Sequence, residues 1–394
     1  MVNKLKSKIA LLLASIIISP VVIFSILEYM ARWSEPPQFL NFETNDRQIN
    51  CKKTTPSLYR LSVDYSHQQK TKYLSEEITY KKLVKNYDHV YTNELGYPLH
   101  KENKNFRQRA TVIETGETAY DVAYSLVEGG RRRVPGADEI LPLAHLAISG
   151  CSVVFGEGLE DDQTLPAQMQ KKVQKTRIYN LGRPGGSVVD AIAMLQITNF
   201  WKNIEPKKGA LLFFHSSQIH VPRFLGTIST VGVWNEYGAF LNEDATTGAF
   251  QYGGVYDQHK PLWTLLSRWA ARSQFLKTIN FDWPPTTNSA LETYVRALSF
   301  LQLQYQQLTD SQNPMVVYLR PGEKESCEII PYLEKYKIYY LDYSDFQMQR
   351  YATQPLKIQY DTHPTQEFNR ILSQQLMHDL TSNKNTQKIH RIFF

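Results

Sequence analysis

The sequence has little cysteine and no cluster of it. Its 394 residues include three cysteines, Cys51, Cys151 and Cys327, and none of them has the spacing of a metal-ligand pair. An odd number leaves at least one thiol unpaired. A disulfide between Cys51 and Cys327 is one alternative in an oxidising compartment. Its geometry cannot be read from sequence, so the pairing stays open. The cysteines therefore predict no metal centre and leave the redox state open.

The chain also lacks a concentration of one charge. Its 44 basic and 38 acidic residues give a formal net charge of +6, and 42% of the residues are hydrophobic. This composition is typical of a globular protein with room for one large domain and an appendage. The local run of Arg131, Arg132 and Arg133 is typical of a solvated turn, and repeats and low-complexity tracts are absent. Nucleic acid is therefore not an expected partner.

Long apolar runs are also scarce. Residues 9–27 form the only uncharged run long enough to span about 30 Å of hydrocarbon as a helix. Lys4, Lys6 and Lys8 precede this run and indicate a cytoplasmic flank. No A-x-A cleavage site follows directly, which favours an uncleaved anchor over a signal peptide. We therefore expect residues 1–34 to form a cytoplasmic tip and transmembrane anchor, with the remainder of the chain outside the cytoplasm.

The remainder divides into a polar region and a region of alternating elements. Residues 35–140 form a linker and a small β-containing accessory region, with a β-hairpin indicated by turn signals at residues 115–116 and 129–130. From residue 141 to 394, short apolar strands alternate with amphipathic helices. The predicted strands cover residues 143–149, 177–181, 210–215, 315–319 and 338–341.

Three apolar stripes mark the main helices of this second region. The stripes consist of Val188, Ile192 and Leu195; Leu291, Val295 and Leu298; and Phe368, Leu372 and Leu376. Alternation of this kind predicts a parallel sheet with helices on both faces and a crevice at the carboxyl ends of the strands. Residues 226–286 are an insertion, whose aromatic residues either stack on sugar rings or form a satellite core. These aromatic residues are Trp234, Tyr237, Tyr252 and Tyr256.

Two nucleophiles follow the first predicted strand of the sheet, in the stretch AISGCSVVFGEGLEDDQTLP at residues 147–166. Both Cys151 and Ser152 lie at the predicted crevice edge. The stretch resembles the first motif of the SGNH hydrolases, also called the GDSL family, with Gly150 and Ser152 matching and Cys151 in the usual place of aspartate. By this resemblance Ser152 is the nucleophile. Cys151 is expected to be a small buried residue behind the turn, and a thiol nucleophile at Cys151 is the alternative.

A serine hydroxyl needs a base and an acid that orients the base. The stretch QYDTHPTQEFN places His363 as the base and Asp361 as the acid, just before the last predicted helix. The family carries its Asp-His motif at this place, although the spacing here is Asp-x-His instead of the commoner Asp-x-x-His. The alternative for the same residues is a helix-start turn capped by Thr365.

The oxyanion of an acyl transfer needs preorganised donors. In YNLGRPGGSVVD a predicted strand ends in a glycine-rich turn before a helix, and Asn180, Gly182 and Gly185 resemble the family's second motif. The backbone N–H groups of Ser152 and Gly185 are the predicted donors, with Gly186 as an alternative to Gly185. A simple helix-entry turn and a phosphate-binding loop are the other interpretations.

The third motif of the family differs in this chain. The family has Gly-x-Asn-Asp after the third strand, whereas the sequence here is FFHSSQIHVPR. Gln218 falls near the place of the asparagine and carries a carboxamide, so it is the predicted third donor. His220 is the alternative, since an imidazole N–H can fill the same role.

The resemblance implies a flavodoxin-like three-layer α/β/α sandwich over residues 141–394. It also implies a membrane-anchored bacterial esterase that needs no metal or organic cofactor, acting on the periplasmic side of the inner membrane. The expected substrate is an acylated carbohydrate or another acyl ester, and the expected reaction removes acetyl or other short acyl groups from a cell-envelope glycan. Two alternatives are a glycan O-acyltransferase with a membrane acyltransferase partner, and a non-catalytic carbohydrate-binding envelope protein.

Overall fold

The computed structural model describes residues 59–64, 68, 83–87, 105–234 and 238–382. The predicted membrane anchor, residues 1–34, lies outside these ranges. None of the helices built from the described residues is both long and apolar enough to cross a membrane. Cys327 is disulfide-bonded and Cys151 is free, whereas Cys51 lies outside the described residues.

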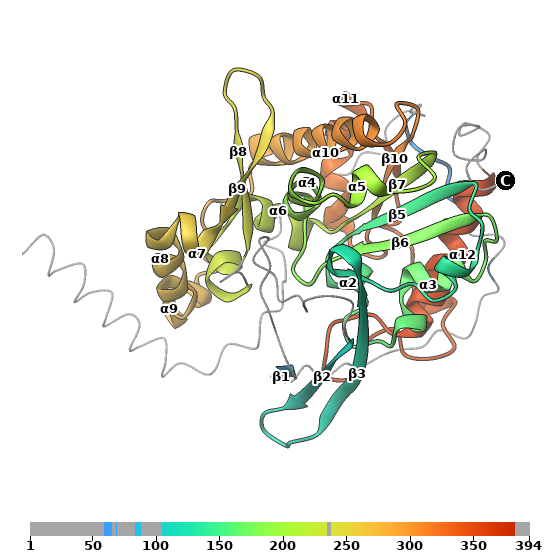
Figure 1. Ribbon diagram of the computed structural model, residues 1–394. Helices are drawn as coiled ribbons and strands as arrows, with labels where there is room; N and C mark the ends of the chain where they lie inside the picture. Colours follow the sequence, from blue (N-terminus) through green and yellow to red (C-terminus); the bar gives the residue numbers. More distant parts are fainter. Residues whose placement is uncertain (1–58, 65–67, 69–82, 88–104, 235–237, 383–394) are drawn as a thin grey trace, which may run out of the picture.

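One large sheet forms the centre of the described structure (Figure 1). Its nine strands have the order β1-β2-β3-β4-β6-β5-β7-β10-β11, and the last five in this order run parallel. These parallel strands are β6 (Thr176–Gly182), β5 (Ala144–Gly150), β7 (Gly209–His215), β10 (Met315–Leu319) and β11 (Tyr339–Leu341). They coincide with the five strands predicted from sequence, so the expected α/β class with a mostly parallel sheet is confirmed.

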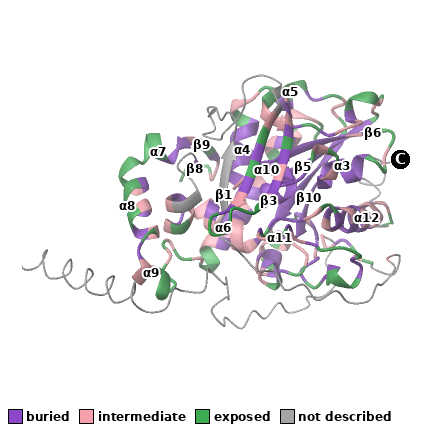
Figure 2. Ribbon diagram, turned by 90° about the horizontal axis from the view of Figure 1, so that it is seen from below, coloured by how far each residue is buried: buried purple, intermediate pink, exposed green. Residues whose placement is uncertain are grey.

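The parallel strands form because their sequences suit burial on both faces. Every residue of β5, β7 and β10 is buried, and Figure 2 shows these buried strands at the centre of the molecule. A parallel strand covered on both sides reads as a continuous apolar run instead of an alternating one. The runs GALLFFH and MVVYL have this character, which is why they were recognisable without the structure.

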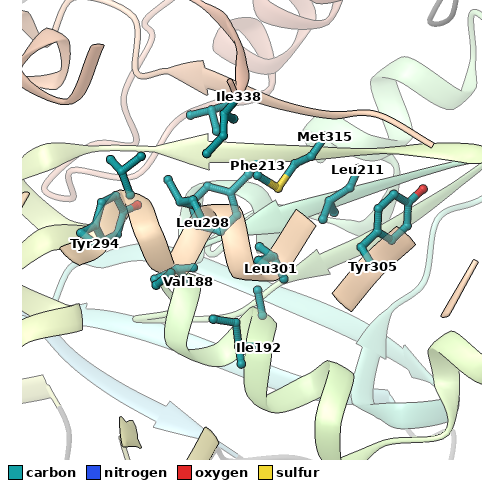
Figure 3. Packing of buried hydrophobic residues seen from close by; sticks show 14 of the residues in the cluster. Val188, Ile192, Leu211, Phe213, Tyr294, Leu298, Leu301, Tyr305, Met315 and Ile338 are labelled. Atoms are coloured by element: carbon teal, nitrogen blue, oxygen red, sulfur yellow. The ribbon is translucent and has the colours of Figure 1, made fainter. Parts of the chain in front are cut away.

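Helices cover both faces of the sheet and create two cores. On one face, α3 (Leu165–Gln170) and α12 (Gln366–Ser382) lie with Leu212 and Phe214 of β7. On the other face, Leu211 and Phe213 of the same strand contact the second core. Among the described helices, five contribute to that core: α4 (Val188–Ile197), α5 (Phe200–Asn203), α6 (Ser217–Leu225), α10 (Asn288–Leu308) and α11 (Ile330–Lys335). Figure 3 shows Val188, Ile192, Leu298 and Leu301 of α4 and α10 meeting the sheet. The predicted apolar stripes therefore face the core.

Antiparallel strands extend the sheet at one edge. The predicted hairpin is confirmed as β2 (Asn105–Val112) and β3 (Thr118–Val127), with β1 (Leu83–Tyr87) beside β2. The short strand β4 (Arg131–Arg132) joins this extension to β6. Neighbouring residues of a strand face opposite sides, so Arg133 is exposed while Arg132 is only 1% exposed. The interpretation of the arginine run as a solvated turn is therefore wrong for Arg132.

The insertion between α6 (Ser217–Leu225) and α10 forms a separate lobe of small elements. It contains the hairpin of β8 (Ala239–Glu243) and β9 (Phe250–Val255), followed by α7 (Tyr256–His259), α8 (Pro261–Ala271) and α9 (Gln274–Thr278). Tyr256 is buried with Val231 and Phe240, and Tyr252 packs against Ala193. These contacts form a satellite core. The side chains of Trp234 and Tyr237 lie outside the described structure.

Candidate active site

Ser152 begins a short helix directly after the central strand of the sheet. Strand β5 ends at Gly150, Cys151 follows, and α2 runs from Ser152 to Phe155. A Cβ at Gly150 would lie 2.8 Å from Val154 Cγ2 and 2.9 Å from Phe214 Cβ, so the tight turn needs glycine there. This turn places Ser152 at the carboxyl edge of the sheet, where the sequence predicted it.

The Ser152 hydroxyl lies in a chain of hydrogen bonds with two distant residues. Its Oγ is 2.9 Å from His363 Nε2, and His363 Nδ1 is 2.8 Å from Asp361 Oδ1. A carboxylate can only accept, so Nδ1 donates to Asp361 and Nε2 presents its lone pair to the hydroxyl. All three side chains are buried, with exposed fractions of 6–7%. The structure therefore brings together the three predicted residues across 211 positions of sequence.

The loop that carries His363 is held closed by its own hydrogen bonds. Ile358 N–H donates to the carbonyl of His363 at 2.9 Å, and Asp361 N–H donates to the carbonyl of Ile358 at 3.0 Å. Asp361 Oδ1 also accepts from the N–H of Thr362 at 2.6 Å. Tyr360 adopts a positive φ of 64°, a strained conformation for a non-glycine residue. These contacts fix Asp361 against His363 before any ligand binds.

Cys151, directly before Ser152, is the alternative nucleophile. It is fully buried in the core beneath α2, with Val154 and Leu146 among its neighbours in that cluster. Burial raises the pKa of its thiol to about 11, so the thiolate needed for nucleophilic attack is disfavoured at neutral pH. The geometry therefore favours Ser152 over Cys151 as the nucleophile.

A second carboxylate, which the sequence interpretation missed, lies beside the imidazole. Glu157 Oε2 is 3.4 Å from His363 Nε2, and Glu157 Oε1 accepts from Gln108 Nε2 at 3.4 Å. The Tyr124 hydroxyl donates to Gln108 Oε1 and accepts from the N–H of Gly158 at 2.8 Å. The sequence signal was a glutamate between two glycines, and its link to strands β2 and β3 was not visible there.

The glycine-rich turn after β6 lies beside the Ser152 turn. Arg183 N–H donates to the carbonyl of Gly150 at 3.1 Å, which ties the two turns together. Gly185 has a φ of 65° and Gly186 N–H donates to the Arg183 carbonyl at 2.8 Å, a hydrogen-bonded turn with Pro184 and Gly185 at its centre. Within the described residues no acceptor is bound to the N–H of Gly185. Gly186, the alternative donor, already uses its N–H in the turn.

The two candidates for the third donor have different surroundings. Gln218 lies in the first turn of α6, its backbone N–H donates to Glu323 Oε1 at 3.0 Å, and its side chain is partly exposed. Among the contacts of the described residues, none joins the Gln218 carboxamide to Ser152. His220 is fully buried, its Nδ1 accepts from the N–H of Ser216 at 3.1 Å, and burial lowers its pKa to about 3. The structure thus keeps His220 neutral and inside the fold.

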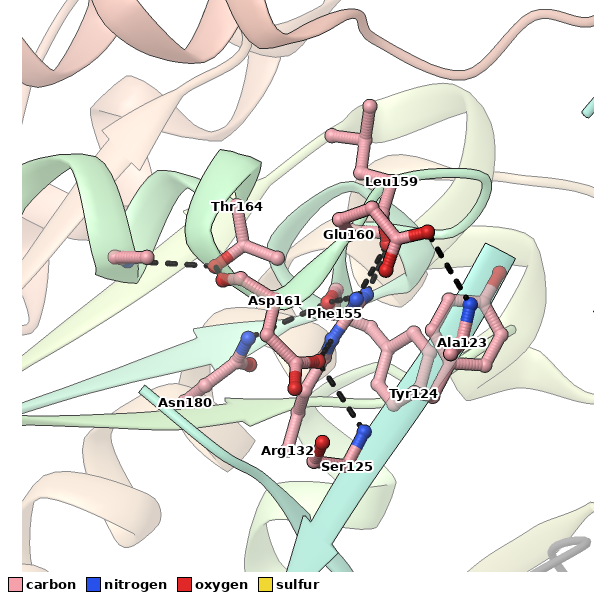
Figure 4. Close-up of polar contacts among 12 residues, drawn as sticks. Ala123, Tyr124, Ser125, Arg132, Phe155, Leu159, Glu160, Asp161, Thr164 and Asn180 are labelled. Carbon is pink, nitrogen blue, oxygen red and sulfur yellow. Dashed lines mark hydrogen bonds and ion pairs between the residues drawn. The ribbon is translucent and has the colours of Figure 1, made fainter. Parts of the chain in front are cut away.

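Arg132 fastens the segment that follows Ser152 to the antiparallel strands (Figure 4). Its guanidinium donates to three carbonyl oxygens, those of Phe155 at 3.0 Å, Gly156 at 2.6 Å and Leu159. It also forms an ion pair with Asp161 at 2.9 Å. Carbonyl groups at the end of a short helix lack partners within the helix. Arg132 gives them a charged donor, beside the Asn180 amide on the Phe155 carbonyl and the Leu159 N–H on the Gly156 carbonyl. The same interactions fix the position of α2.

Together these contacts define an α/β protein with the geometry of a Ser-His-Asp triad at the carboxyl edge of a parallel sheet. The N–H groups of Ser152 and Gly185 lie on the two turns that meet at this edge. In the described ranges, no group of three or more His, Cys, Asp or Glu residues is arranged to hold a metal ion. The chemistry that the arrangement itself supports is nucleophilic attack by a serine hydroxyl.

Comparisons with known proteins give matches in structure but not in sequence. No family model and no curated protein matches the sequence. One similar solved structure is a lipolytic protein of the G-D-S-L family from Veillonella parvula, with 10% identity, a TM-score of 0.33, and coverage of 60% of this chain and 97% of the other. A second, also of the G-D-S-L family, is from Desulfitobacterium hafniense, with 12% identity, a TM-score of 0.33, and coverage of 60% and 99%.

A third similar structure is a GDSL-like lipase from Bacteroides ovatus, with 11% identity, a TM-score of 0.34, and coverage of 73% of this chain and 69% of the other. These structural neighbours are proteins of the GDSL, or SGNH, lipolytic family, the family that the motifs around Ser152 and His363 resemble.

Proposed function

We propose that the protein is a serine ester hydrolase of the SGNH type. The observation that carries the proposal is the continuous chain from Ser152 Oγ to His363 Nε2 at 2.9 Å and from His363 Nδ1 to Asp361 Oδ1 at 2.8 Å. A plain helix-start turn needs Thr365 as a cap but needs no contact between His363 and a serine at the start of a distant helix. The contact between His363 and Ser152 therefore favours catalysis.

In the first step of the proposed reaction, Ser152 Oγ attacks the ester carbonyl while His363 Nε2 takes the hydroxyl proton. Asp361 keeps Nδ1 protonated and stabilises the imidazolium that forms. The N–H groups of Ser152 and Gly185 donate to the developing oxyanion, with Gln218 as the proposed third donor after side-chain movement. The leaving alcohol takes the proton from His363, and the acyl group stays on Ser152.

The proposed substrate is a short acyl ester on a cell-envelope glycan, and the proposed location is the periplasmic side of a bacterial inner membrane. Two features support the location: the basic flank before the apolar run at residues 9–27, and the disulfide-bonded state of Cys327. The finer fold assignment, a three-layer α/β/α sandwich of the flavodoxin-like type, is part of the same proposal. It is supported by helices on both faces of the parallel strands.

Hydrolysis of p-nitrophenyl acetate by the purified full chain tests the proposal. Turnover that needs only water supports an esterase. Turnover that appears only when a sugar acceptor and a membrane acyltransferase are added would instead indicate the O-acyltransferase. Complete lack of turnover in both assays, together with binding of an acylated sugar, would indicate a non-catalytic binding protein and contradict the proposal.

Asp361→Asn is expected to reduce turnover less than loss of Ser152 or His363 does. The asparagine amide no longer fixes the tautomer of His363, which lowers kcat by about 10⁴-fold in a triad of this kind. The measurement is kcat for p-nitrophenyl acetate, with Asp345→Asn as the matched control because Asp345 is exposed. Unchanged kcat in Asp361→Asn would contradict the assigned role of Asp361.

A further inference from the structure

Helix α8 exposes large apolar side chains on one face. The exposed fractions are 76% for Leu262, 64% for Leu265, 57% for Leu266 and 59% for Trp269. These four residues have the spacing i, i+3, i+4 and i+7, so they lie on a single face of α8 (Pro261–Ala271). Single exposed apolar residues are common on proteins, but four on one helical face form a patch that marks an interaction site.

The opposite face of α8 is buried and carries small residues. Thr264, Ser267 and Ala270 face inward, and a Cβ added to Gly232 would lie 2.3 Å from the carbonyl oxygen of Ser267. The helix is therefore packed closely against the segment containing Gly232, and its larger apolar residues are directed outward. This distribution is the reverse of an ordinary surface helix, whose large apolar residues face the core.

The segment that carries this face has basic residues only, and the nearest acidic residues in the sequence are Asp257 and Asp282. Residues 260–281 contain four basic residues and no acidic residue, although the whole chain has 44 basic and 38 acidic residues. The four are Lys260, Arg268, Arg272 and Lys277. Arg268 forms a partly exposed ion pair with Asp257 at 3.2 Å, while Arg272 and Lys277 are exposed. An apolar stripe with flanking cations is the pattern of a helix that lies in the interface of an anionic bilayer.

We propose that α8 docks on the surface of a lipid bilayer that contains anionic headgroups. Leu262, Leu265, Leu266 and Trp269 enter the boundary between headgroups and acyl chains, and the basic residues of 260–281 contact the headgroups. Tryptophan suits this boundary because its ring is apolar and its N–H is polar. After α9, the exposed side chains of Ile279, Phe281 and Trp283 add apolar surface to the same lobe.

The position of α8 gives this docking a consequence for the candidate active site. In Figure 1, α8 and α9 extend from the side of the molecule on which α2 and α6 follow the carboxyl ends of β5 and β7. The lobe that carries α8 therefore lies on the side of the sheet that carries Ser152. The docking itself does not depend on the proposed hydrolase activity.

Quenching of Trp269 by brominated lipid tests the docking in the full chain. The protein is reconstituted with vesicles of phosphatidylethanolamine and phosphatidylglycerol, with and without bromine on the acyl chains. The emission that is lost in Trp269→Phe is assigned to Trp269. Bromine is expected to reduce this part of the emission at least about twofold, because Trp269 lies at the level of the acyl chains when α8 is docked. Emission from Trp269 that bromine does not change would overturn the proposal.

Paired variants distinguish the bilayer from other occupants of the α8 face. Leu265→Gln with Leu266→Gln is expected to restore the Trp269 emission, whereas Leu303→Gln is not, since Leu303 is also exposed but lies on α10. A second copy of the chain is the occupant if the protein sediments as a dimer in detergent and the Leu265/Leu266 double variant sediments as a monomer. That result, or a purified protein partner whose binding the same double variant abolishes, would contradict bilayer docking.

A second and independent inference concerns Glu157 and rests on the proposed hydrolase function. Its buried carboxylate lies 3.4 Å from His363 Nε2, the same atom that contacts Ser152 Oγ. Gln108 of strand β2 donates to the carboxylate, and Tyr124 of strand β3 donates to Gln108. A water molecule that reacts with an acyl group on Ser152 must lie next to His363 Nε2, and Glu157 Oε2 is within reach of that place.

We infer that Glu157 orients the nucleophile of the second step. The water oxygen bonds to the acyl carbon, one water proton moves to His363 Nε2, and the other is held in a hydrogen bond to Glu157. Collapse of the tetrahedral intermediate breaks the bond to Ser152 Oγ, which recovers the proton from His363. The products are the free carboxylic acid and the unmodified serine, and Glu157 keeps its charge throughout.

The test separates the two steps with Glu157→Gln in the full chain. Release of p-nitrophenol in the first turnover reports acylation, and intact mass reports the acetyl group on the protein. Steady-state turnover is expected to fall at least about tenfold while the first-turnover rate changes less than about threefold, so acetylated protein accumulates. An equal loss in both steps would overturn the inference about Glu157. Absence of a first turnover in the wild type would instead contradict the proposed hydrolase function.

Discussion

Replacing Ser152 with alanine is expected to lower kcat for p-nitrophenyl acetate by about 10⁶-fold, the loss measured when the nucleophile of a serine triad is removed. His363→Ala is expected to produce a loss of similar size. The reason is that Ser152 Oγ and His363 Nε2, 2.9 Å apart, transfer one proton and act as a unit. The double variant should therefore be no slower than either single variant.

Matched substitutions separate this loss from a loss of folding. Ser289→Ala and His378→Ala change the same residue types at partly or fully exposed positions and should leave kcat unchanged. Ser152→Ala is expected to keep the thermal midpoint of the wild type, because it removes one side-chain hydrogen bond. His363→Ala also removes a partner of the buried Asp361, so its midpoint is expected to be lower, and circular dichroism checks that it is folded. Near-normal kcat in Ser152→Ala or in His363→Ala would contradict the assigned triad.

Replacing Arg132 with methionine is expected to lower the free energy of unfolding by about 3–5 kcal/mol, the cost of removing one partner from a buried charged network. The variant leaves the carbonyl groups of Phe155, Gly156 and Leu159 without the guanidinium that they contact. It also removes the ion pair with Asp161. Turnover should fall as well, because the same contacts hold the segment that follows Ser152. Urea unfolding in detergent solution measures the change.

Arg133→Met is the matched control for this prediction. Arg133 neighbours Arg132 on the chain but is exposed, so its replacement should change the free energy of unfolding by no more than about 0.5 kcal/mol. Equal effects of the two substitutions would mean that burial of Arg132 contributes nothing to stability. A stable Arg132→Met variant with normal turnover would contradict the account of the loop.

The parallel strands could be predicted because their signal is local. A strand such as β7, GALLFFH, is apolar up to its last residue, His215, since both of its faces are buried, and no distant residue is needed to recognise it. The antiparallel extension is different. Strand β4 has only two residues, Arg131 and Arg132, and its pairing of Arg132 with Asn180 depends on contacts between segments far apart in sequence.

The candidate site shows the same division. Ser152, Asp361 and His363 could be proposed because each belongs to a short motif next to a recognisable strand or helix. The roles of two other residues, Arg132 and Glu157, could not be predicted. Arg132 was interpreted as part of a solvated run, although strand alternation places it inside. The proximity of Glu157 to the imidazole appears only in the folded chain, because residues 157 and 363 are far apart in sequence.

Cys151 and Thr365, two residues that the sequence singles out, have defined places in the structure. Cys151, in the usual place of an aspartate, is fully buried and packs in the core beneath α2. Thr365, considered as a helix cap, does accept from the N–H of Phe368 at 3.4 Å, and this role coexists with the contact of His363 to Ser152. One short segment therefore both starts α12 and presents the imidazole, which sequence alone could not establish.

Covalent labelling with a fluorophosphonate probe shows whether Ser152 is an activated nucleophile, and it needs no knowledge of the natural substrate. The probe reacts with a serine that an adjacent base activates. We expect a single adduct, which peptide mass spectrometry locates on Ser152 in the wild type and in Cys151→Ala, and no adduct in Ser152→Ala. Wild-type protein that carries no adduct, or an adduct that persists in Ser152→Ala, would contradict the assignment of Ser152 as an activated nucleophile.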